Sequence, residues 1–129
     1  MIGSRNMTIE TFADTIQLEQ SAPGCFSGSL TLPVQLGVFE GHFPGNPVLP
    51  GVAFVFIAEK LVSRSWGKPF KLKELRKTKF FRPAKPLDVL QIQAETVPDS
   101  DDETLLKAQV LFSDEQMQRV CLVKMTMEL

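Results

Sequence analysis

The stretch Gly41-His42-Phe43-Pro44-Gly45-Asn46-Pro47-Val48-Leu49-Pro50-Gly51 leads directly into an apolar run, Val52 to Ala58. It holds three prolines, three glycines and the single histidine of the chain. Proline lacks a backbone N–H and glycine lacks conformational restraint, so regular structure is excluded up to Gly51. Histidine is the side chain that titrates nearest neutral pH. We therefore expect any chemistry of this chain to begin at His42.

The segment from Val52 to about Ser65 is predicted to be the main helix. It contains no glycine or proline, and its length and the polar continuation Glu59 to Arg64 favour a helix over a strand. Its first turns are apolar on every side, which is typical of a buried helix. Gly67 and Pro69 then end it.

The remaining segments alternate between apolar and polar residues and are predicted to be strands. Before the main helix, Thr11 to Gln20 and Cys25 to Leu32 form a predicted hairpin around the turn Ser21 to Gly24. Gly28 marks either a bulge or a close backbone approach. The predicted strands after the helix are Lys71 to Phe81, Val89 to Val97, Thr104 to Phe112 and Val120 to Leu129.

These elements predict a single α+β domain over residues 1–129. An apolar helix needs cover, which an antiparallel sheet of about five or six strands wrapped round one long central helix would supply. Short loops between the later strands require antiparallel pairing. Such a sheet has open edges, so dimerisation through an edge is a natural expectation.

Composition and charge restrict the class of partner. The 129 residues are 43% hydrophobic and 22% charged with a net charge of −1, as in an ordinary globular domain, which argues against a nucleic-acid partner. Eight basic residues lie between Lys68 and Lys85 against one acid, Glu74, whereas all charges from Glu95 to Glu103 are acidic. The basic run is either a solvated face or a docking surface for an acidic partner.

The sequence points to a cytoplasmic protein without metal or cofactor. Cys25 and Cys121 are far apart and no export signal precedes them, so two buried, reduced thiols are expected. One histidine without a close cysteine pair gives no metal-ligand spacing. The longest mostly apolar run, Val48 to Ala58, is too short to span a bilayer.

Two motifs resemble those of a known family. The stretch Gly41 to Val52 closely resembles the signature of the 3-hydroxyacyl-[acyl-carrier-protein] dehydratases of fatty-acid biosynthesis, which have the hotdog fold. Lys79 to Asp88 resembles the family's Lys-Phe-(Arg)-Arg-Pro-x-x-Pro-Gly-Asp segment. The resemblance covers roughly Phe39 to Glu95. The segment Leu-Pro-Gly-Val-Ala is most similar to the corresponding segment of the dehydratase-like proteins of the ApeI-like branch, which belong to aryl-polyene or related acyl-lipid pathways.

The resemblance implies a specific site. His42 would be the general base that removes the α-proton of a 3-hydroxyacyl thioester, and the N–H groups of Gly51 and Val52 would hold the thioester carbonyl. Phe43 and Pro50 would contact the substrate, whose acyl chain lies in an apolar tunnel between two protomers in the family. The implied partners are acyl carrier protein or a coenzyme A thioester, and a homodimer or hotdog heterodimer.

The chain departs from the family at the acid. Family members carry an acidic residue five positions after the Pro-Gly glycine, where this chain has Phe56. A phenyl ring cannot donate a proton. Glu59 lies one turn further along nearly the same helix face and is the candidate replacement, although it could equally mark the helix leaving the core. Glu40 is a weaker candidate. Phe54 and Phe56 are expected to pack in the core or line an acyl pocket.

Three hypotheses follow from these residues. The first is an enzyme, a dehydratase of 3-hydroxyacyl thioesters. The second is a catalytically inactive hotdog protein that binds acyl carrier protein or an acyl thioester, or completes a heterodimer with an active partner; Phe56 favours it. The third keeps the fold and changes the reaction to thioester hydrolysis, with His42 or Glu59 activating water.

Overall fold

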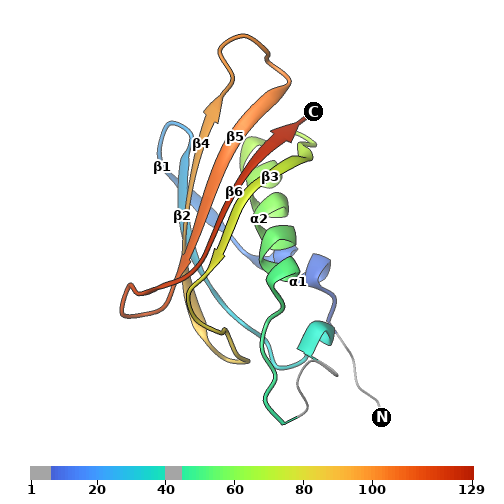
Figure 1. Ribbon diagram of the computed structural model, residues 1–129, viewed down its shortest axis with the longest axis vertical. Helices are drawn as coiled ribbons and strands as arrows, with labels where there is room; N and C mark the ends of the chain where they lie inside the picture. The colour runs from blue at the N-terminus through green and yellow to red at the C-terminus, as the bar shows by residue number, and fades with distance from the viewer. Residues whose placement is uncertain (1–6, 40–44) are drawn as a thin grey trace.

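Six antiparallel strands form one curved sheet in the order β1-β2-β4-β5-β6-β3. The computed structural model describes residues 7–39 and 45–129. The sheet curves around α2 (Gly51–Trp66), with the shorter α1 beside that helix (Figure 1). The strands are β1 Leu18–Ala22, β2 Cys25–Thr31, β3 Lys71–Phe80, β4 Val89–Pro98, β5 Leu105–Ser113 and β6 Arg119–Glu128. This arrangement confirms the predicted antiparallel sheet around a central helix.

The core lies between the concave face of the sheet and α2. Alternation in β4, β5 and β6 is nearly regular, so every second side chain points inward and is buried. Phe112 and Met125 from the sheet meet Ile57 and Leu61 from α2, and none of the four is more than 1% exposed. Burying each such side chain contributes about 1.5–3 kcal/mol, which fixes the position of the helix against the sheet.

The expectation that α2 is buried on every side is wrong. Ala53, Phe54, Ile57 and the other core-facing residues are buried, but Val52 is 76% exposed and Val55 and Phe56 are only half-buried. Residues 52, 55, 56 and 59 fall on one side of a helix with 3.6 residues per turn. The described part of one chain therefore covers this side of α2, the α2 stripe, only in part.

The predicted strand from Thr11 to Gln20 is also wrong, because its first half is the helix α1 (Ile9–Thr15). Thr8 caps this helix: its side chain accepts a hydrogen bond of 3.0 Å from the N–H of Thr11. Phe12 and Ile16 are both buried, and a spacing of four fits a helix as well as a strand. Only Leu18–Ala22 is a strand, which pairs with β2 in the predicted hairpin.

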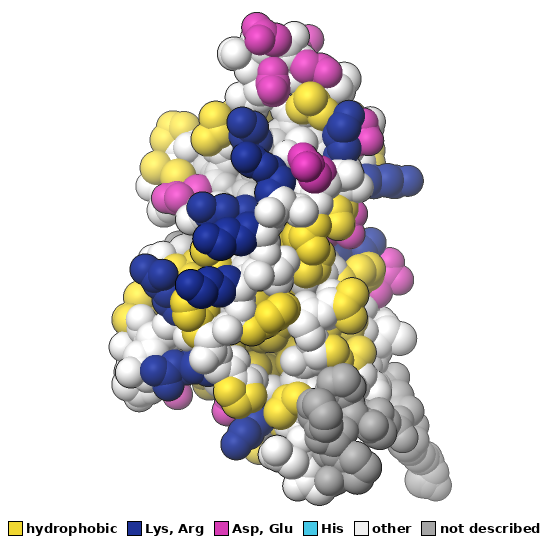
Figure 2. All heavy atoms as spheres, in the orientation of Figure 1, with side chains coloured by type: hydrophobic (Ala, Val, Ile, Leu, Met, Phe, Trp, Pro, Cys, Tyr) yellow, Lys and Arg dark blue, Asp and Glu magenta, His cyan; other side chains and the backbone are white. Residues whose placement is uncertain are grey.

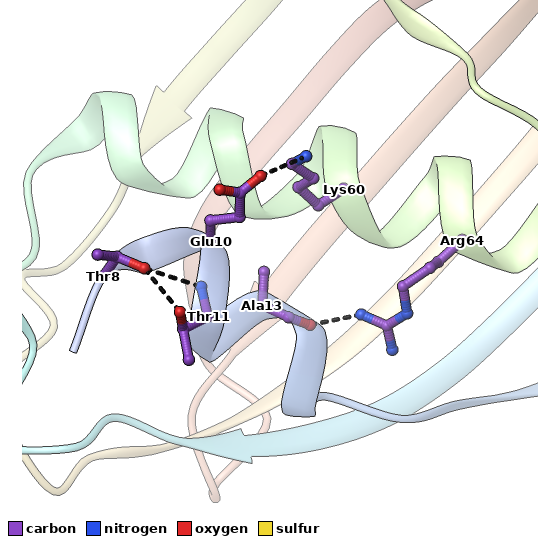
Figure 3. A network of polar contacts seen from close by, with 6 residues as sticks. All are labelled: Thr8, Glu10, Thr11, Ala13, Lys60 and Arg64. Carbon is purple, nitrogen blue, oxygen red and sulfur yellow. Dashed lines mark hydrogen bonds and ion pairs between the residues drawn. The ribbon is translucent and has the colours of Figure 1, made fainter.

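Polar contacts attach α1 to α2 (Figure 3). Lys60 on α2 forms an ion pair of 3.1 Å with Glu10 on α1. The guanidinium of Arg64 donates to the backbone carbonyls of Ala13 and Ile16 at the C-terminal end of α1. Arg64 therefore completes the C-terminus of a helix distant in sequence.

Close backbone contacts organise the β1–β2 hairpin. A Cβ atom at Gly28 would lie 2.5 Å from the carbonyl oxygen of Gln17, so this glycine marks a close approach, one of its two predicted roles. The hairpin is tied to the rest of the fold through Thr96, whose hydroxyl donates to Gly24 O at 2.7 Å and accepts from Trp66 Nε1 at 3.0 Å. This network joins the end of α2, β4 and the hairpin turn.

Strand β3 forms one edge of the sheet. It pairs with β6 alone among the described strands, and its register shifts twice, between Leu72 and Glu74 and between Leu75 and Lys77. These irregularities explain why alternation in this segment is imperfect, and they leave Leu75 and Phe80 exposed. A short 3-10 helix, Gly37–Phe39, precedes the stretch that carries the first motif.

Both cysteines are free thiols. Cys121 is buried, whereas Cys25 is only half-buried, so the prediction of two buried thiols holds for one of them. Burial raises the pKa of Cys121 to about 12. Within residues 7–39 and 45–129, none of the helices has the length and apolarity needed to cross a membrane.

Candidate functional site

The structure brings the two motifs of the sequence together in one groove. A backbone hydrogen bond of 2.7 Å from Leu49 N–H to Ala84 O joins the first motif to the second. Between them lies a groove of about 390 Å³ at the start of α2. Its lining residues are Val48, Leu49, Pro50, Gly51, Phe54, Phe80, Phe81, Arg82 and Pro83. The groove is mainly apolar and ends at backbone N–H groups.

The start of α2 is open to a ligand. Pro50 is the N-cap residue and makes no side-chain capping bond, and the first turn carries no acidic residue. Among the hydrogen bonds of the described residues, none takes up the N–H of Gly51 or Val52. Unpaired N–H groups and the helix dipole make this end electropositive. The arrangement suits a carbonyl oxygen on which negative charge develops.

Phe80 lies directly over Gly51. A Cβ atom at Gly51 would lie 2.5 Å from Cζ of Phe80, so only glycine lets the ring approach the helix start. The Phe80 ring also packs at an angle of 51° to Phe54, with centroids 6.2 Å apart. Phe80 is nevertheless 53% exposed and forms one wall of the groove. Its contact with Gly51 couples β3 to the first turn of α2.

Basic side chains surround the outer wall of the groove. Lys79 Nζ lies 5.3 Å from the centroid of the Phe81 ring and the Arg119 guanidinium carbon 5.6 Å from it. Arg82 itself lines the groove. Figure 2 shows Lys and Arg side chains gathered over the middle of the molecule and Asp and Glu side chains at one end. A negatively charged group approaching the groove therefore meets a favourable potential.

The other predicted site residues on α2 lie outside this groove. Val52, Phe56 and Glu59 belong to the partly covered α2 stripe, and none lines the groove. Lys60 Nζ lies 5.5 Å from the centroid of the Phe56 ring, so an ammonium group lies beside the phenyl ring at the position where the resemblance implies an acid. Glu59 Oε2 accepts a 2.7 Å hydrogen bond from the N–H of Leu72 at the first β3 irregularity. This bond attaches Glu59 to the backbone of its own chain.

Three of the candidate residues, Glu40, His42 and Phe43, lie outside the described residues. Of the predicted contacts to substrate, Pro50 and Gly51 line the groove. The groove also contains three residues that were not predicted for the site: Phe80, Phe81 and Arg82. They belong to the second motif, which is the sequence feature that could have indicated them. Within residues 7–39 and 45–129, no three His, Cys, Asp or Glu side chains gather as metal ligands.

Comparisons with known proteins identify the family of this chain. The family model described as ApeI-like, ApeI dehydratase, matches residues 18–120. The curated relatives include 3-hydroxyacyl-[acyl-carrier-protein] dehydratases named FabZ. The one from Lactiplantibacillus plantarum is 34% identical over 83 residues, covering 59% of this chain and 56% of that protein. The one from Acidiphilium cryptum is 38% identical over 74 residues, covering 50% and 45%. This chain thus spans about half the length of these relatives.

Solved structures show the same fold. The dehydratase heterocomplex ApeI:P from Xenorhabdus doucetiae matches with a TM-score of 0.68 and 23% identity, over 88% of this chain and 95% of that one. The E. coli PaaI protein matches with a TM-score of 0.69 and 16% identity, over 94% and 89%. The fold and the match to the family model define a hotdog protein of the dehydratase type. The chain belongs to the ApeI-like dehydratase family.

Proposed function

We propose that the protein acts on 3-hydroxyacyl thioesters as a dehydratase in the biosynthesis of fatty acids or of related acyl lipids or polyenes. The observation that carries this proposal is the groove at the start of α2, where Gly51 adjoins an apolar wall and the N–H groups of Gly51 and Val52 have no hydrogen-bond partner among residues 7–39 and 45–129. A thioester carbonyl fits at the N–H groups, and an acyl chain fits along Phe54 and Phe80.

In the proposed reaction, the thioester carbonyl oxygen accepts hydrogen bonds from Gly51 and Val52, which lowers the energy of the enolate. His42 takes the proton from C2 as general base. The C3–O bond then breaks, and the leaving hydroxyl needs a proton to depart as water. Glu59 is the candidate donor for that step. Its Oε2 is bonded to Leu72, and among the described residues no hydrogen bond occupies Oε1.

The substrate carrier is proposed to be acyl carrier protein or coenzyme A. Lys79, Arg82 and Arg119 lie around the groove and would attract an acidic carrier protein or a phosphate group. A second protomer, from this chain or another hotdog protein, is proposed to cover the α2 stripe and the free edge of β3. Exposed Val52 and Leu75 on these two elements support that interface.

Phe56 supports a second candidate function from another class. With a phenyl ring and the Lys60 ammonium where the family has its acid, the chain could bind an acyl thioester without dehydrating it. In that case it completes a heterodimer whose other subunit supplies the acid. The dehydratase heterocomplex ApeI:P, which shares this fold, is an assembly of this kind.

The deciding experiment incubates the purified protein with 3-hydroxyacyl-carrier protein and with the coenzyme A thioester, and measures the enoyl product. We expect turnover that His42→Ala abolishes and Glu59→Gln reduces. If wild type is inactive across chain lengths, the dehydratase proposal fails. Detection of free acid and thiol instead of enoyl product would favour the thioesterase hypothesis.

A companion variant tests the missing acid. Phe56→Glu places a carboxylate four residues before Lys60, and such a pair attracts at this spacing. Pairing would favour the ionised carboxylate and weaken it as an acid. Phe56→Glu with Lys60→Met is therefore the sharper variant. Activity that appears in the double variant but not in Lys60→Met alone would support the binding-protein candidate.

A further inference from the structure

Three basic side chains gather on the face of the sheet that points away from α2. In β5 and β6 every second side chain is buried against the core, as those of Ala108 and Met125 are. Lys107 and Lys124 lie next to these residues in their strands and therefore point to the outer face. Arg76 of β3 joins them around a pocket of about 230 Å³. The groove at the start of α2 shares no lining residue with this outer pocket.

An irregularity in β3 brings Arg76 to this outer pocket. At the second register shift Leu75 lies opposite Met125 and Lys77 lies opposite Lys124, so Arg76 is an extra residue without a paired residue on β6. An extra residue of this kind changes the direction of a side chain, and such bulges recur beside binding sites. The edge strand thus adds a guanidinium group to the two ammonium groups of β5 and β6.

The charges around the outer pocket are not balanced within the described chain. Its lining residues include one carboxylate, that of Glu95, against the cations of Arg76, Lys107 and Lys124. Among the described residues, no ion pair includes any of these three cations. Lys77 adds a further positive charge directly opposite Lys124, and like charges in such a cross-strand pair are destabilising. Folding of the chain alone therefore does not account for this excess of positive charge.

We propose that the outer pocket binds a phosphate group, carried either by a small soluble monoester or by a lipid headgroup. A phosphate monoester carries a charge of about −1.5 to −2 at pH 7, which matches three cations and one carboxylate. The Arg76 guanidinium offers two parallel N–H donors to phosphate oxygens, and the ammonium groups act as point charges. The Gln109 amide, which lines the pocket opposite Lys124, offers a neutral donor.

The size of the outer pocket restricts the ligand further. Sites for drug-sized ligands have volumes of about 300–1,000 Å³, whereas this pocket has about 230 Å³. It therefore suits the phosphate group itself and a few further atoms, and not a whole nucleotide. The site is separate from thioester chemistry, because its lysines point away from the core and from α2.

The test titrates the isotope-labelled protein with inorganic phosphate, while chloride salt keeps the ionic strength constant, and follows the backbone amides by NMR. We expect saturable shifts at residues 107–109 and at Lys124, with a midpoint of about 1–10 mM. Arg76→Gln and Lys124→Gln should each weaken binding about tenfold, because each removes a charged donor. The matched control is Lys68→Gln, which removes one positive charge at an exposed position outside the pocket. It should bind phosphate like the wild type.

Two further probes distinguish the sources of the phosphate. Glycerol phosphate that shifts the same amides and competes with inorganic phosphate would identify a soluble monoester. Cosedimentation with vesicles of equal parts phosphatidylcholine and phosphatidic acid, but not with pure phosphatidylcholine vesicles, would identify a lipid headgroup if Lys124→Gln abolishes it.

Two results would overturn the proposal. One is a set of amide shifts that rises with phosphate without saturating. The other is an equal loss of binding in Lys68→Gln and Lys124→Gln, which would mean that phosphate responds only to the overall charge. Lys124→Gln should leave thioester turnover unchanged, so the phosphate site and the proposed dehydratase activity are tested independently.

Discussion

The contact between Gly51 and Phe80 gives a sharp prediction, because it joins the proposed thioester site to the edge strand. In Gly51→Ala the new Cβ would lie 2.5 Å from Cζ and 3.0 and 3.1 Å from the two Cε atoms of Phe80. The ring must therefore move by roughly an ångström to reach normal contact, and such overpacking costs about 1–3 kcal/mol. Phe80 is half exposed and can tilt outward, which places the cost near the lower end.

Alanine in place of glycine offsets part of that cost. Removing glycine from a helix stabilises it by about 0.5–1 kcal/mol. We therefore expect Gly51→Ala to lower the free energy of unfolding by only about 0.5 kcal/mol. In a Phe80→Ala background the clash is absent, and the same substitution should be neutral or stabilising. The coupling energy between the two sites should thus be about 1–2 kcal/mol.

Urea unfolding of the wild type, both single variants and the double variant measures this coupling. Thioester turnover by the same four proteins shows whether displacing the ring also disturbs the site. Changes that add to within about 0.3 kcal/mol would refute the reasoning, since they would mean that Phe80 does not restrict residue 51.

Three further predictions concern the framework of the site. Thr96→Val leaves Trp66 Nε1 without its acceptor and should lower the free energy of unfolding by about 1–3 kcal/mol, measured by urea titration. Arg64→Met removes the donors to the last carbonyls of α1 and should increase hydrogen exchange in Ile9–Thr15 while exchange in β5 stays unchanged. Cys121, whose pKa burial raises from 9.0 to about 12, should resist a thiol reagent at pH 8 that labels Cys25. The Cys121 thiol ionises at a lower pH in the unfolded chain than in the folded chain. Its contribution to the free energy of unfolding is therefore present below pH 9 and is lost as the pH rises towards 12. Alkaline unfolding of Cys121→Ala, compared with that of the wild type, would show this loss.

The strands were the most predictable part of the fold. In β4, β5 and β6 the inward-facing residues are paired in regular register with those of the neighbouring strand. Buried and exposed residues therefore alternate with a period of two, which is visible in the sequence alone. In β3 two register shifts interrupt this period, and the pattern there was correspondingly weak. The helix α1 was predicted as part of a strand because Phe12 and Ile16, which are both buried, are four residues apart and satisfy both periods.

The sequence identified the two motifs of the site but not the groove that they form together. The sequence placed the start of the helix at Gly51 and Val52, and α2 begins at Gly51, with Pro50 and Gly51 lining the groove. Residues 54 and 56 are both phenylalanine, yet they point to different sides of α2: Phe54 lines the groove and Phe56 does not. Because the first turns of α2 are apolar on every side, hydrophobicity alone does not show which of the two phenylalanines faces the groove.

The order of the strands has a consequence for how the site forms in time. Phe80 reaches its place over Gly51 as part of β3, and β3 pairs with β6, where Phe80 lies opposite Cys121. That pairing joins segments some forty residues apart in sequence, and it comes after β4 and β5 along the chain. Contacts of this range are formed slowly, because a long loop must close before they stabilise anything. We therefore expect the groove to mature late in folding: a chain lacking β6 has every residue of the groove but no strand to hold Phe80 against the helix.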